Sequence, residues 1–224
     1  MRLRCFFVSE QRKTNMFDVI GNTVNVFTKM HLGPWQDLGD TLLAGEGNMS
    51  FAKSLLLKPA TQITRMIVTI FEKERSLTNE AVNNTNTLKR CGTFVMFGID
   101  ATRLEDNFKP DEFDTIIFQF PNVGSRDAKY GHNPNHVLIR KFLRSAVACL
   151  KPSGKIMVTA VDSPHYQGVF QFEEAAEFAG CEILETYPFD LSMFPGYSHT
   201  NTNDDESALD DYDRFKTWVF GLKR

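Results

Sequence analysis

The chain has 224 residues, of which 42% are hydrophobic, and its net charge of −3 corresponds to an isoelectric point near 6.0. This size and composition predict one globular domain with a substantial core, to which twenty phenylalanines contribute. The lack of a basic excess argues against a dedicated nucleic-acid-binding protein and leaves room only for a local basic face.

The four cysteines, Cys5, Cys91, Cys149 and Cys181, form neither a CxxC pair nor a Cys/His spacing. We therefore expect no structural zinc, no other metal site and no disulfide framework, and we predict a cytoplasmic location, or a nuclear or nucleolar one in a eukaryote. No apolar run approaches the roughly 18 residues that a membrane span needs, so no membrane partner is expected.

Residues 1–38 are interpreted as an N-terminal extension that packs on a main domain of residues 39–224, and the apolar spacing of the extension predicts helix. Gly33-Pro34 interrupts this pattern. The apolar core of the basic N-terminus is too short for a signal peptide. A role in covering the substrate is the alternative interpretation of the extension.

From Thr41 onward, apolar runs typical of strands alternate with segments of helical spacing. We expect helices at 50–56, 76–90, 137–150 and 169–179, and a turn at 151–154. We expect strands at 41–44, 66–71, 93–97, 113–120, 155–161, 181–187 and 215–222. This alternation predicts an α/β fold with a parallel sheet between two layers of helices. In such sheets the ligand lies beyond the carboxyl ends of the strands, so the residues that follow each strand are the candidates for a site.

The first strand ends in the glycine turn Gly45-Glu46-Gly47-Asn48, and a helix is expected to begin at Ser50 and Phe51, with Ser50 as its N-cap. Strand, glycine turn and helix together are typical of a cradle for a nucleotide-like ligand. The pattern is only GxGxxS, without the third glycine of a dinucleotide fingerprint, and an ordinary strand-to-helix turn is the alternative.

The second and third strands are followed by acidic residues. Glu72, or Glu74 in its place, is suited to accept hydrogen bonds from ribose hydroxyls. Asp100 is suited to accept from the adenine amine, with Ala101 and Thr102 offering backbone contacts. A solvent-exposed glutamate and a turn-forming aspartate are the alternatives. The chain has no GxxxxGKS motif and Glu46 would repel a pyrophosphate, so the adenosine ligand is predicted to be S-adenosylmethionine rather than NAD or ATP.

After the fourth strand, we expect a floor for a planar acceptor, formed by Gln119, Phe120, Pro121 and Asn122. The proline fixes the turn, the ring can stack and the amide can hydrogen-bond to a base edge. A strand-terminating proline turn is the alternative.

Four motifs in this order resemble one family, the class I methyltransferases typified by the large-subunit rRNA uridine-N3 methyltransferases. They are Gly45–Phe51, Phe97–Thr102, Phe113–Gly124 and Phe194–His199. The resemblance runs from about Thr41 to the C-terminus. It implies a Rossmann-like, doubly wound and mostly parallel seven-stranded sheet with an antiparallel C-terminal strand. It also implies S-adenosylmethionine as cofactor, RNA as partner and rRNA as substrate.

The same resemblance places the methionine end of the cofactor at residues 45–48 and the adenine at residues 100–102, and Ser50, Phe51, Glu72 and Phe120 are added to this cofactor set. The chain departs from the family at two places. The family usually has Asn-Phe-Pro-His where Gln119 and Asn122 stand here, and Arg-Arg-Thr where residues 200–202 are Thr-Asn-Thr.

Methyl transfer to a uracil-type nitrogen requires loss of the N–H proton near the transfer step, so a base should lie beside the donor. The candidates after the fifth strand are Asp162, His165 and Tyr166, and Tyr197 and His199 come from the late loop. Of these, Asp162 and His165, with Gln119 and Asn122, are predicted to be catalytic. The other three, with Pro121, are predicted to bind the substrate.

Two alternative functions remain open from the sequence. One is a methyltransferase for a small molecule or peptide, with the acidic segment 201–213 as a lid. The other is a non-catalytic module that binds S-adenosylmethionine. Hydrolase chemistry has no support, because the sequence holds no GxSxG motif.

Overall fold

A computed structural model describes residues 33–124, 128, 131–164, 168–199, 212 and 214–223. Three predictions therefore lie outside the described residues: the extension up to residue 32, the pair His165 and Tyr166, and the acidic segment 201–213 except Tyr212. Among the described residues, no helix has the length and apolarity that a membrane crossing requires.

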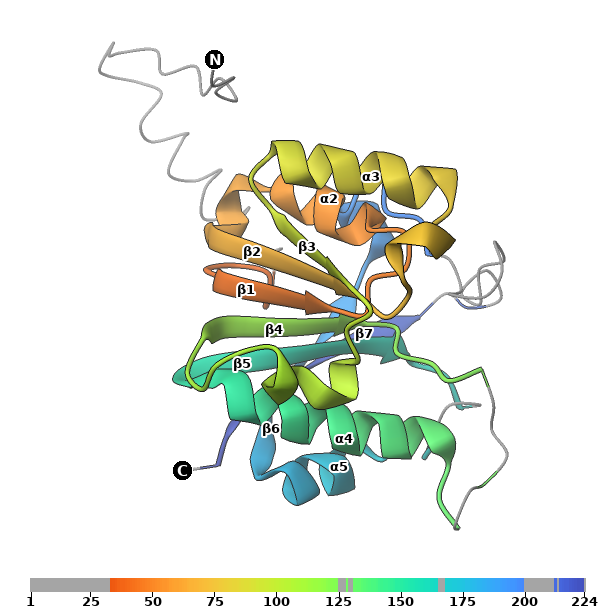
Figure 1. The fold of residues 1–224 in the computed structure, drawn as a ribbon. Coiled ribbons are helices and arrows are strands. Elements are labelled where there is room, and N and C mark those ends of the chain that lie inside the picture. The colour runs from red at the N-terminus through yellow and green to blue at the C-terminus, as the bar shows by residue number, and fades with distance from the viewer. Residues whose placement is uncertain are drawn as a thin grey trace, which may run out of the picture.

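The centre of the molecule is a seven-stranded sheet with the strand order β3-β2-β1-β4-β5-β7-β6 (Figure 1). The strands are β1 Gly39–Ala44, β2 Ile63–Ile70, β3 Phe94–Phe97, β4 Phe113–Gln119, β5 Leu150–Val161, β6 Cys181–Phe189 and β7 Phe215–Leu222. Strands β3, β2, β1, β4 and β5 pair in parallel, whereas β7 is antiparallel to both β5 and β6. The predicted mostly parallel sheet with an antiparallel C-terminal strand is confirmed.

Helices cover both faces of this sheet (Figure 1). On one face lie α2 Ser50–Leu56 and α3 Asn79–Arg90, and on the other lie α4 Pro134–Cys149 and α5 Phe172–Ala179. The described residues also form four short 3₁₀ segments: η1 Pro59–Thr61, η2 Glu74–Ser76, η3 Ala101–Asp106 and η5 Leu191–Met193.

The central strands are buried on both sides because successive side chains point to opposite faces and both faces carry helices. In β1, Leu42 packs into the core beneath α4 and α5, while its neighbour Leu43 packs into the core beneath α2 and α3. Both leucines are at most 1% exposed. The uninterrupted apolar runs of the sequence therefore reflect two cores that share one sheet.

The predicted turn at residues 151–154 is instead an irregularity inside β5. Leu150 pairs with Phe113 and Lys155 with Thr115, so four residues on β5 lie opposite one on β4. Gly154 fits this close approach, since a Cβ there would lie 3.0 Å from the carbonyl oxygen of Asp114. Because the strand continues on both sides of this irregularity, β5 begins at Leu150 rather than at Lys155, where the sequence pattern predicts its start.

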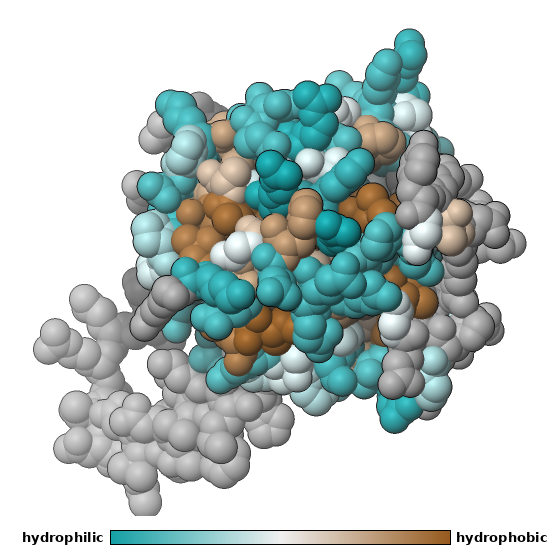
Figure 2. Space-filling view, turned by 90° about the horizontal axis from the view of Figure 1, so that it is seen from below, coloured by the Kyte–Doolittle hydropathy of each residue, from teal (hydrophilic) through white to brown (hydrophobic). Residues whose placement is uncertain are grey.

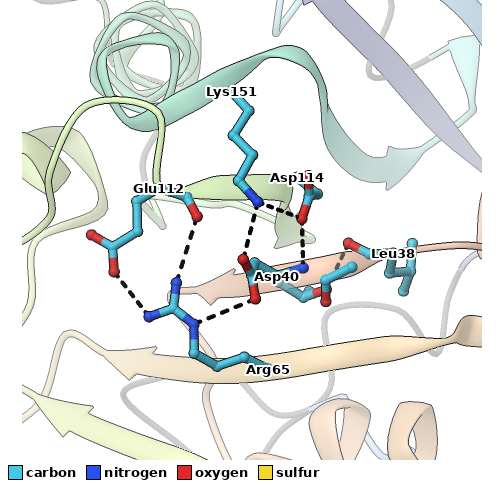
Figure 3. Close-up of polar contacts among 8 residues, drawn as sticks. Leu38, Asp40, Arg65, Glu112, Asp114 and Lys151 are labelled. Atoms are coloured by element: carbon cyan, nitrogen blue, oxygen red, sulfur yellow. Dashed lines mark hydrogen bonds and ion pairs between the residues drawn. The ribbon is translucent and has the colours of Figure 1, made fainter.

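A charged network joins the amino ends of the parallel strands, away from their carboxyl ends (Figure 3). Lys151 Nζ lies 3.0 Å from Asp40 and 2.8 Å from Asp114, and Arg65 pairs with Asp40 at 3.5 Å and Glu112 at 3.1 Å. Asp114 also accepts a 2.8 Å hydrogen bond from the Asp40 N–H. Since these side chains come from or precede β1, β2, β4 and β5, the network fixes the starts of four neighbouring strands.

The segment after β6 folds back over the α2 face. Phe194 is 1% exposed, and its ring centroid lies 5.2 Å from Trp35 and 4.9 Å from Phe51. Phe189, at the end of β6, stacks on Phe194 at 5.1 Å. This aromatic cluster brings the late loop to the glycine turn, about 150 residues earlier in the chain.

Candidate functional site

A cavity of about 850 Å³ opens at the carboxyl ends of the parallel strands, around the point where β1 and β4 lie side by side. Its size is within the range of small-molecule sites. The sequence-predicted residues in its wall are Gly45, Glu46, Gly47, Asn48, Glu72, Asp100, Ala101, Thr102, Gln119, Phe120, Pro121, Asn122, Tyr197 and His199. The structure therefore brings together predicted residues from four strand ends and the late loop.

The glycine turn follows β1 with a sharp change of backbone direction. Gly45 has φ +66°, and a Cβ at this position would lie 2.5 Å from Cε2 of Phe118. Only glycine fits both the left-handed conformation and this close approach. Asn48 closes the turn, because its side-chain oxygen accepts hydrogen bonds from the Ser50 N–H and hydroxyl at 3.0 and 2.7 Å.

The start of α2 differs from the prediction. Its N-cap is Met49, with φ 61°, and Ser50 is the first helical residue. The Ser50 hydroxyl, which donates its one proton to Asn48, accepts a 3.0 Å hydrogen bond from the Ser198 N–H and lies 2.9 Å from the Ser198 carbonyl oxygen. Ser50 and Phe51 are buried and lie behind the cavity wall rather than in it.

Side chains of the turn occupy two N–H groups at the start of α2. Asn48 accepts from Ser50, and Glu46 Oε2 accepts from Ala52 at 3.3 Å. These two amides are not available to a ligand, and the turn therefore contacts the cavity chiefly through its own backbone and through the Glu46 and Asn48 side chains.

The electrostatic character of the cavity is set by three carboxylates. Burial raises the pKa of Glu46 to about 7, an effect that the hydrogen bond from the Ala52 N–H partly opposes. Burial also raises the pKa of Glu72. Asp100 is the third carboxylate, and Lys141 is the one lysine or arginine among the described lining residues. Such a cavity favours a cationic ligand and disfavours a polyphosphate.

Asp100 both caps a 3₁₀ segment and lines the cavity. Its Oδ1 accepts 2.8 Å hydrogen bonds from the Thr102 N–H and hydroxyl, which makes it the N-cap of η3. The alternative reading as a turn residue is thus correct, and Asp100 also lines the cavity with Ala101 and Thr102. The cap fixes the direction of this carboxylate.

The opposite wall is formed by the end of β4. Phe120 has φ 47°, an uncommon backbone conformation for a bulky residue, and its N–H donates to the Thr159 carbonyl at 2.8 Å. Its ring is 8% exposed and lies 5.3 Å from Phe215. Both polar atoms of the Gln119 amide are buried, and within the described part of the chain neither has a hydrogen-bond partner. Asn122 is exposed and accepts from the Gly124 N–H at 2.9 Å.

The late loop completes the wall through Tyr197 and His199. The His199 ring lies edge-on to Phe120, 5.4 Å between centroids, and the Tyr197 ring lies 5.2 Å from Phe51. Burial, and to a lesser extent the charge of Glu46, raises the pKa of Tyr197 well above its usual value. Tyr197 is therefore a neutral hydrogen-bonding group at physiological pH.

Asp162 is not in the cavity wall. Its carboxylate pairs with Lys216 on β7 at 3.2 Å, which makes it a poor candidate for the proton acceptor. His165 and Tyr166 lie outside the described residues.

Two groups stand out among the lining residues that the sequence analysis did not predict. Phe71 directly follows β2 and is 64% exposed at the cavity. On α4, Pro134, Val137, Leu138 and Lys141 line the cavity at the spacing i, i+3, i+4 and i+7. That spacing is one face of a helix and was visible in the sequence, but the sequence did not indicate that this face borders a site.

Comparison with solved structures supports the fold. An S-adenosylmethionine-dependent methyltransferase from Clostridium acetobutylicum aligns over 94% of this chain and 100% of its own, with a TM-score of 0.52 and 10% identity. TrmN from Thermus thermophilus aligns over 89% of this chain and 48% of its own, with a TM-score of 0.50 and 13% identity. At these identities the likeness establishes the class I methyltransferase fold alone.

The mammalian sequence relatives are longer proteins. The mouse ferredoxin-fold anticodon-binding domain-containing protein 1 homolog is 33% identical over 175 residues, which is 71% of this chain. The chain spans 27% of the length of that relative and 28% of its human counterpart's. The family model described as rRNA (uridine-N3-)-methyltransferase, BMT5-like, matches residues 42–201, a range that contains every described residue of the cavity wall. This chain is a member of the BMT5-like rRNA (uridine-N3-)-methyltransferase family, a family of S-adenosylmethionine-dependent methyltransferases.

Proposed function

We propose that the chain binds S-adenosylmethionine in the cavity and transfers its methyl group to the N3 atom of a uracil-type base in rRNA. Family membership supports the reaction class. The observation that carries the acceptor assignment is Gln119, whose amide nitrogen and oxygen are both buried in the cavity wall without a partner among the described residues. A buried amide of this kind is costly unless a ligand completes its hydrogen bonds.

The donor half of the site is proposed to lie between the glycine turn, Glu72 and Asp100. S-Adenosylmethionine carries a sulfonium and an ammonium charge, and both suit a cavity with three carboxylates. Glu72 would accept from the ribose hydroxyls and Asp100 from the adenine amine. The exposed ring of Phe71, beside Glu72, would cover the adenosine.

The acceptor half is proposed to lie between the end of β4 and the late loop. The Gln119 N–H would donate to one of the two carbonyl oxygens that flank N3 of uracil. This bond would strengthen as N3 loses its proton, because the negative charge spreads onto these oxygens. The strained backbone of Phe120 is held in place by the Thr159 carbonyl, and strain of this kind is concentrated at functional sites.

The proton acceptor is proposed to be His199. It lies in the cavity wall with Gln119, whereas Asp162 is paired with Lys216. Histidine is neutral over most of the physiological pH range and can accept a proton there. The rest of the catalysis would come from holding N3 in line with the methyl group and the sulfur. Lys141, exposed at the rim, would contact a phosphate of the RNA.

The test is a transfer assay with a deuterated methyl donor and RNA fragments that contain large-subunit rRNA sequence, followed by digestion to nucleosides and mass spectrometry. Labelled N3-methyluridine from the wild-type chain, and at least tenfold less from Gln119→Leu, is the expected result. Label at a different atom of the base would refute the N3 assignment, and label on no RNA would refute the RNA acceptor.

One observation favours the alternative of a small-molecule or peptide acceptor: Lys141 is the one lysine or arginine in the described cavity lining, against three carboxylates. RNA binding depends steeply on salt because phosphate contacts release counterions. Acceptor binding that is insensitive to salt would therefore favour the alternative. Donor binding without transfer to any acceptor would indicate a non-catalytic module.

A further inference from the structure

Three potential metal ligands, His132, His136 and Glu174, meet outside the cavity wall. One ligand atom from each lies within 4.8 Å of the others. His136 is in the first turn of α4, His132 precedes that helix, and Glu174 is in the first turn of α5. Figure 2 views the molecule from the side of α4 and α5 and shows a mainly hydrophilic surface with separate hydrophobic patches.

The protonation of His136 follows from its hydrogen bond. Nδ1 lies 2.8 Å from the carbonyl oxygen of Phe170, and because a carbonyl can only accept, Nδ1 carries the proton. In a neutral ring Nε2 then carries a lone pair. The side chain is 1% exposed, and Nε2 has no hydrogen-bond partner among the residues that the structure describes.

A carboxylate oxygen, which is itself an acceptor, lies close to that lone pair. Glu174 Oε1 lies 3.5 Å from His136 Nε2, so two electron-rich atoms face each other at the edge of the core. A positive charge between them, either a proton on Nε2 or a metal ion, would relieve their repulsion. A proton would account for His136 and Glu174 but would leave the position of His132 without explanation.

A metal ion accounts for all three side chains. Bond lengths of about 2.0–2.1 Å to zinc in a tetrahedron place neighbouring ligand atoms roughly 3.3 Å apart, close to the 3.5 Å between His136 and Glu174. The His132 ring is 5.7 Å from the His136 ring between centroids. A histidine that donates its other N–H to a backbone carbonyl, as His136 does to Phe170, is the usual arrangement behind a metal.

We propose that His132, His136 and Glu174 bind a divalent transition-metal ion of the zinc class, with water in the remaining position. Imidazole and carboxylate ligands suit this class of ion. Arg140 lies 4.0 Å from Glu174 Oε1 and also stacks on Phe178 at 3.9 Å, so its charge weakens the site without occupying it. The site is independent of the proposed methyl transfer.

The position of the ion gives it a structural role. Pro134 and Val137 on α4, and Phe170 before α5, line the methyltransferase cavity. An ion held by His132, His136 and Glu174 would fasten the first turn of α4 to α5, while the hydrogen bond of His136 connects it to Phe170. It would therefore stiffen one wall of the cavity without contacting the cofactor.

The test uses the full chain, stripped of metal with EDTA and dialysed, and then titrated with Zn²⁺ by calorimetry and with Co²⁺ by absorption spectroscopy. The variants are Glu174→Gln and His132→Gln, both at exposed positions. Glu173→Gln is the matched control, because it removes the same charge from the neighbouring exposed residue of α5. Circular dichroism confirms that each variant is folded.

The expected result is one Zn²⁺ per chain with micromolar or tighter affinity, weakened at least tenfold in Glu174→Gln and His132→Gln and within twofold of wild type in Glu173→Gln. Zinc should also raise the thermal midpoint of the wild type and not of the two site variants. The absence of stoichiometric binding would overturn the proposal. Equal binding in Glu174→Gln, or a thiolate-to-cobalt absorption band that assigns the ion to a cysteine, would also overturn it.

Discussion

Replacement of Glu46 by glutamine should make the empty protein more stable at alkaline pH. Burial raises the pKa of Glu46 from 4.5 to about 7 in the folded chain. Because the folded pKa lies above the unfolded one, the unfolded state releases this proton first, and the free energy of unfolding falls as pH rises from about 4.5 to about 7. At about 1.4 kcal/mol per pKa unit, the ionised carboxylate costs the folded state roughly 3 kcal/mol above pH 7.

Glutamine keeps an oxygen that can accept from the Ala52 N–H but has no proton to lose in this range. Its own packing cost is the same at every pH, so the useful quantity is the stability difference between Glu46→Gln and wild type, compared at two pH values. Between pH 5 and pH 8 this difference should move in favour of the variant by roughly 2.5 kcal/mol.

Urea unfolding of wild type and Glu46→Gln at both pH values measures this difference. Glu177→Gln, at an exposed position on α5, serves as the control and should follow the wild type. If the stability difference for Glu46→Gln is the same at pH 5 and pH 8, the carboxylate is not buried at the cavity as described. Cofactor binding supplies a second readout, since cationic groups beside Glu46 would favour its ionised form. Binding at pH 6 should therefore release a proton, visible as a heat that depends on the buffer.

Three further substitutions separate other features of the molecule. Asp100→Ala should lower the free energy of unfolding by about 1 kcal/mol, because it removes a helix cap, whereas Asp100→Asn should leave it unchanged. Urea unfolding measures both variants, and an equal loss of stability in the two would contradict the capping role. Gln119→Leu should leave the affinity for S-adenosylmethionine within twofold of wild type and reduce methyl transfer at least tenfold, since the amide is assigned to the acceptor. A parallel loss of donor affinity, measured by calorimetry, would disprove that assignment. Lys151→Met should lower the urea midpoint at low salt, because Asp40 and Asp114 lose the cation between them, and this effect should shrink at high salt. A urea midpoint that stays equally low at high salt would indicate a packing defect instead.

The sequence predicted the local features of the fold well. All seven expected strands are present. The central strands β1, β2, β4 and β5 contain apolar runs that are buried on both faces, whereas the edge strands β3 and β6 are largely exposed or half-buried. The bulge in β5 was predicted as a turn, since Pro152 and Gly154 carry a turn signal whether or not the strand continues beyond them. The sequence also predicted both roles of Asp100, as a turn residue and as a cavity residue, because an aspartate at a strand end suits capping as well as ligand binding.

The sequence did not predict the contacts between residues that lie far apart in the chain. Ser198 binds Ser50 across 148 residues of chain, and only the packing of Phe194 against Trp35 and Phe51 explains why the late loop lies there. The proximity of Glu174 to His132 and His136 likewise depends on how α5 packs on α4. No local sequence pattern indicates such a contact, and the spacing of the cysteines carries no information about a site made of histidines and a glutamate.

The central claim is that the cavity at the carboxyl ends of the strands binds S-adenosylmethionine. The most direct measurement is a calorimetric titration with S-adenosylhomocysteine of wild type, Asp100→Asn and, as control, Asp106→Asn, which lies in the same 3₁₀ segment and pairs with Arg103. We predict saturable binding of one ligand per chain, weakened at least tenfold by Asp100→Asn and unchanged by Asp106→Asn. No binding, or equal binding in all three proteins, would contradict the claim.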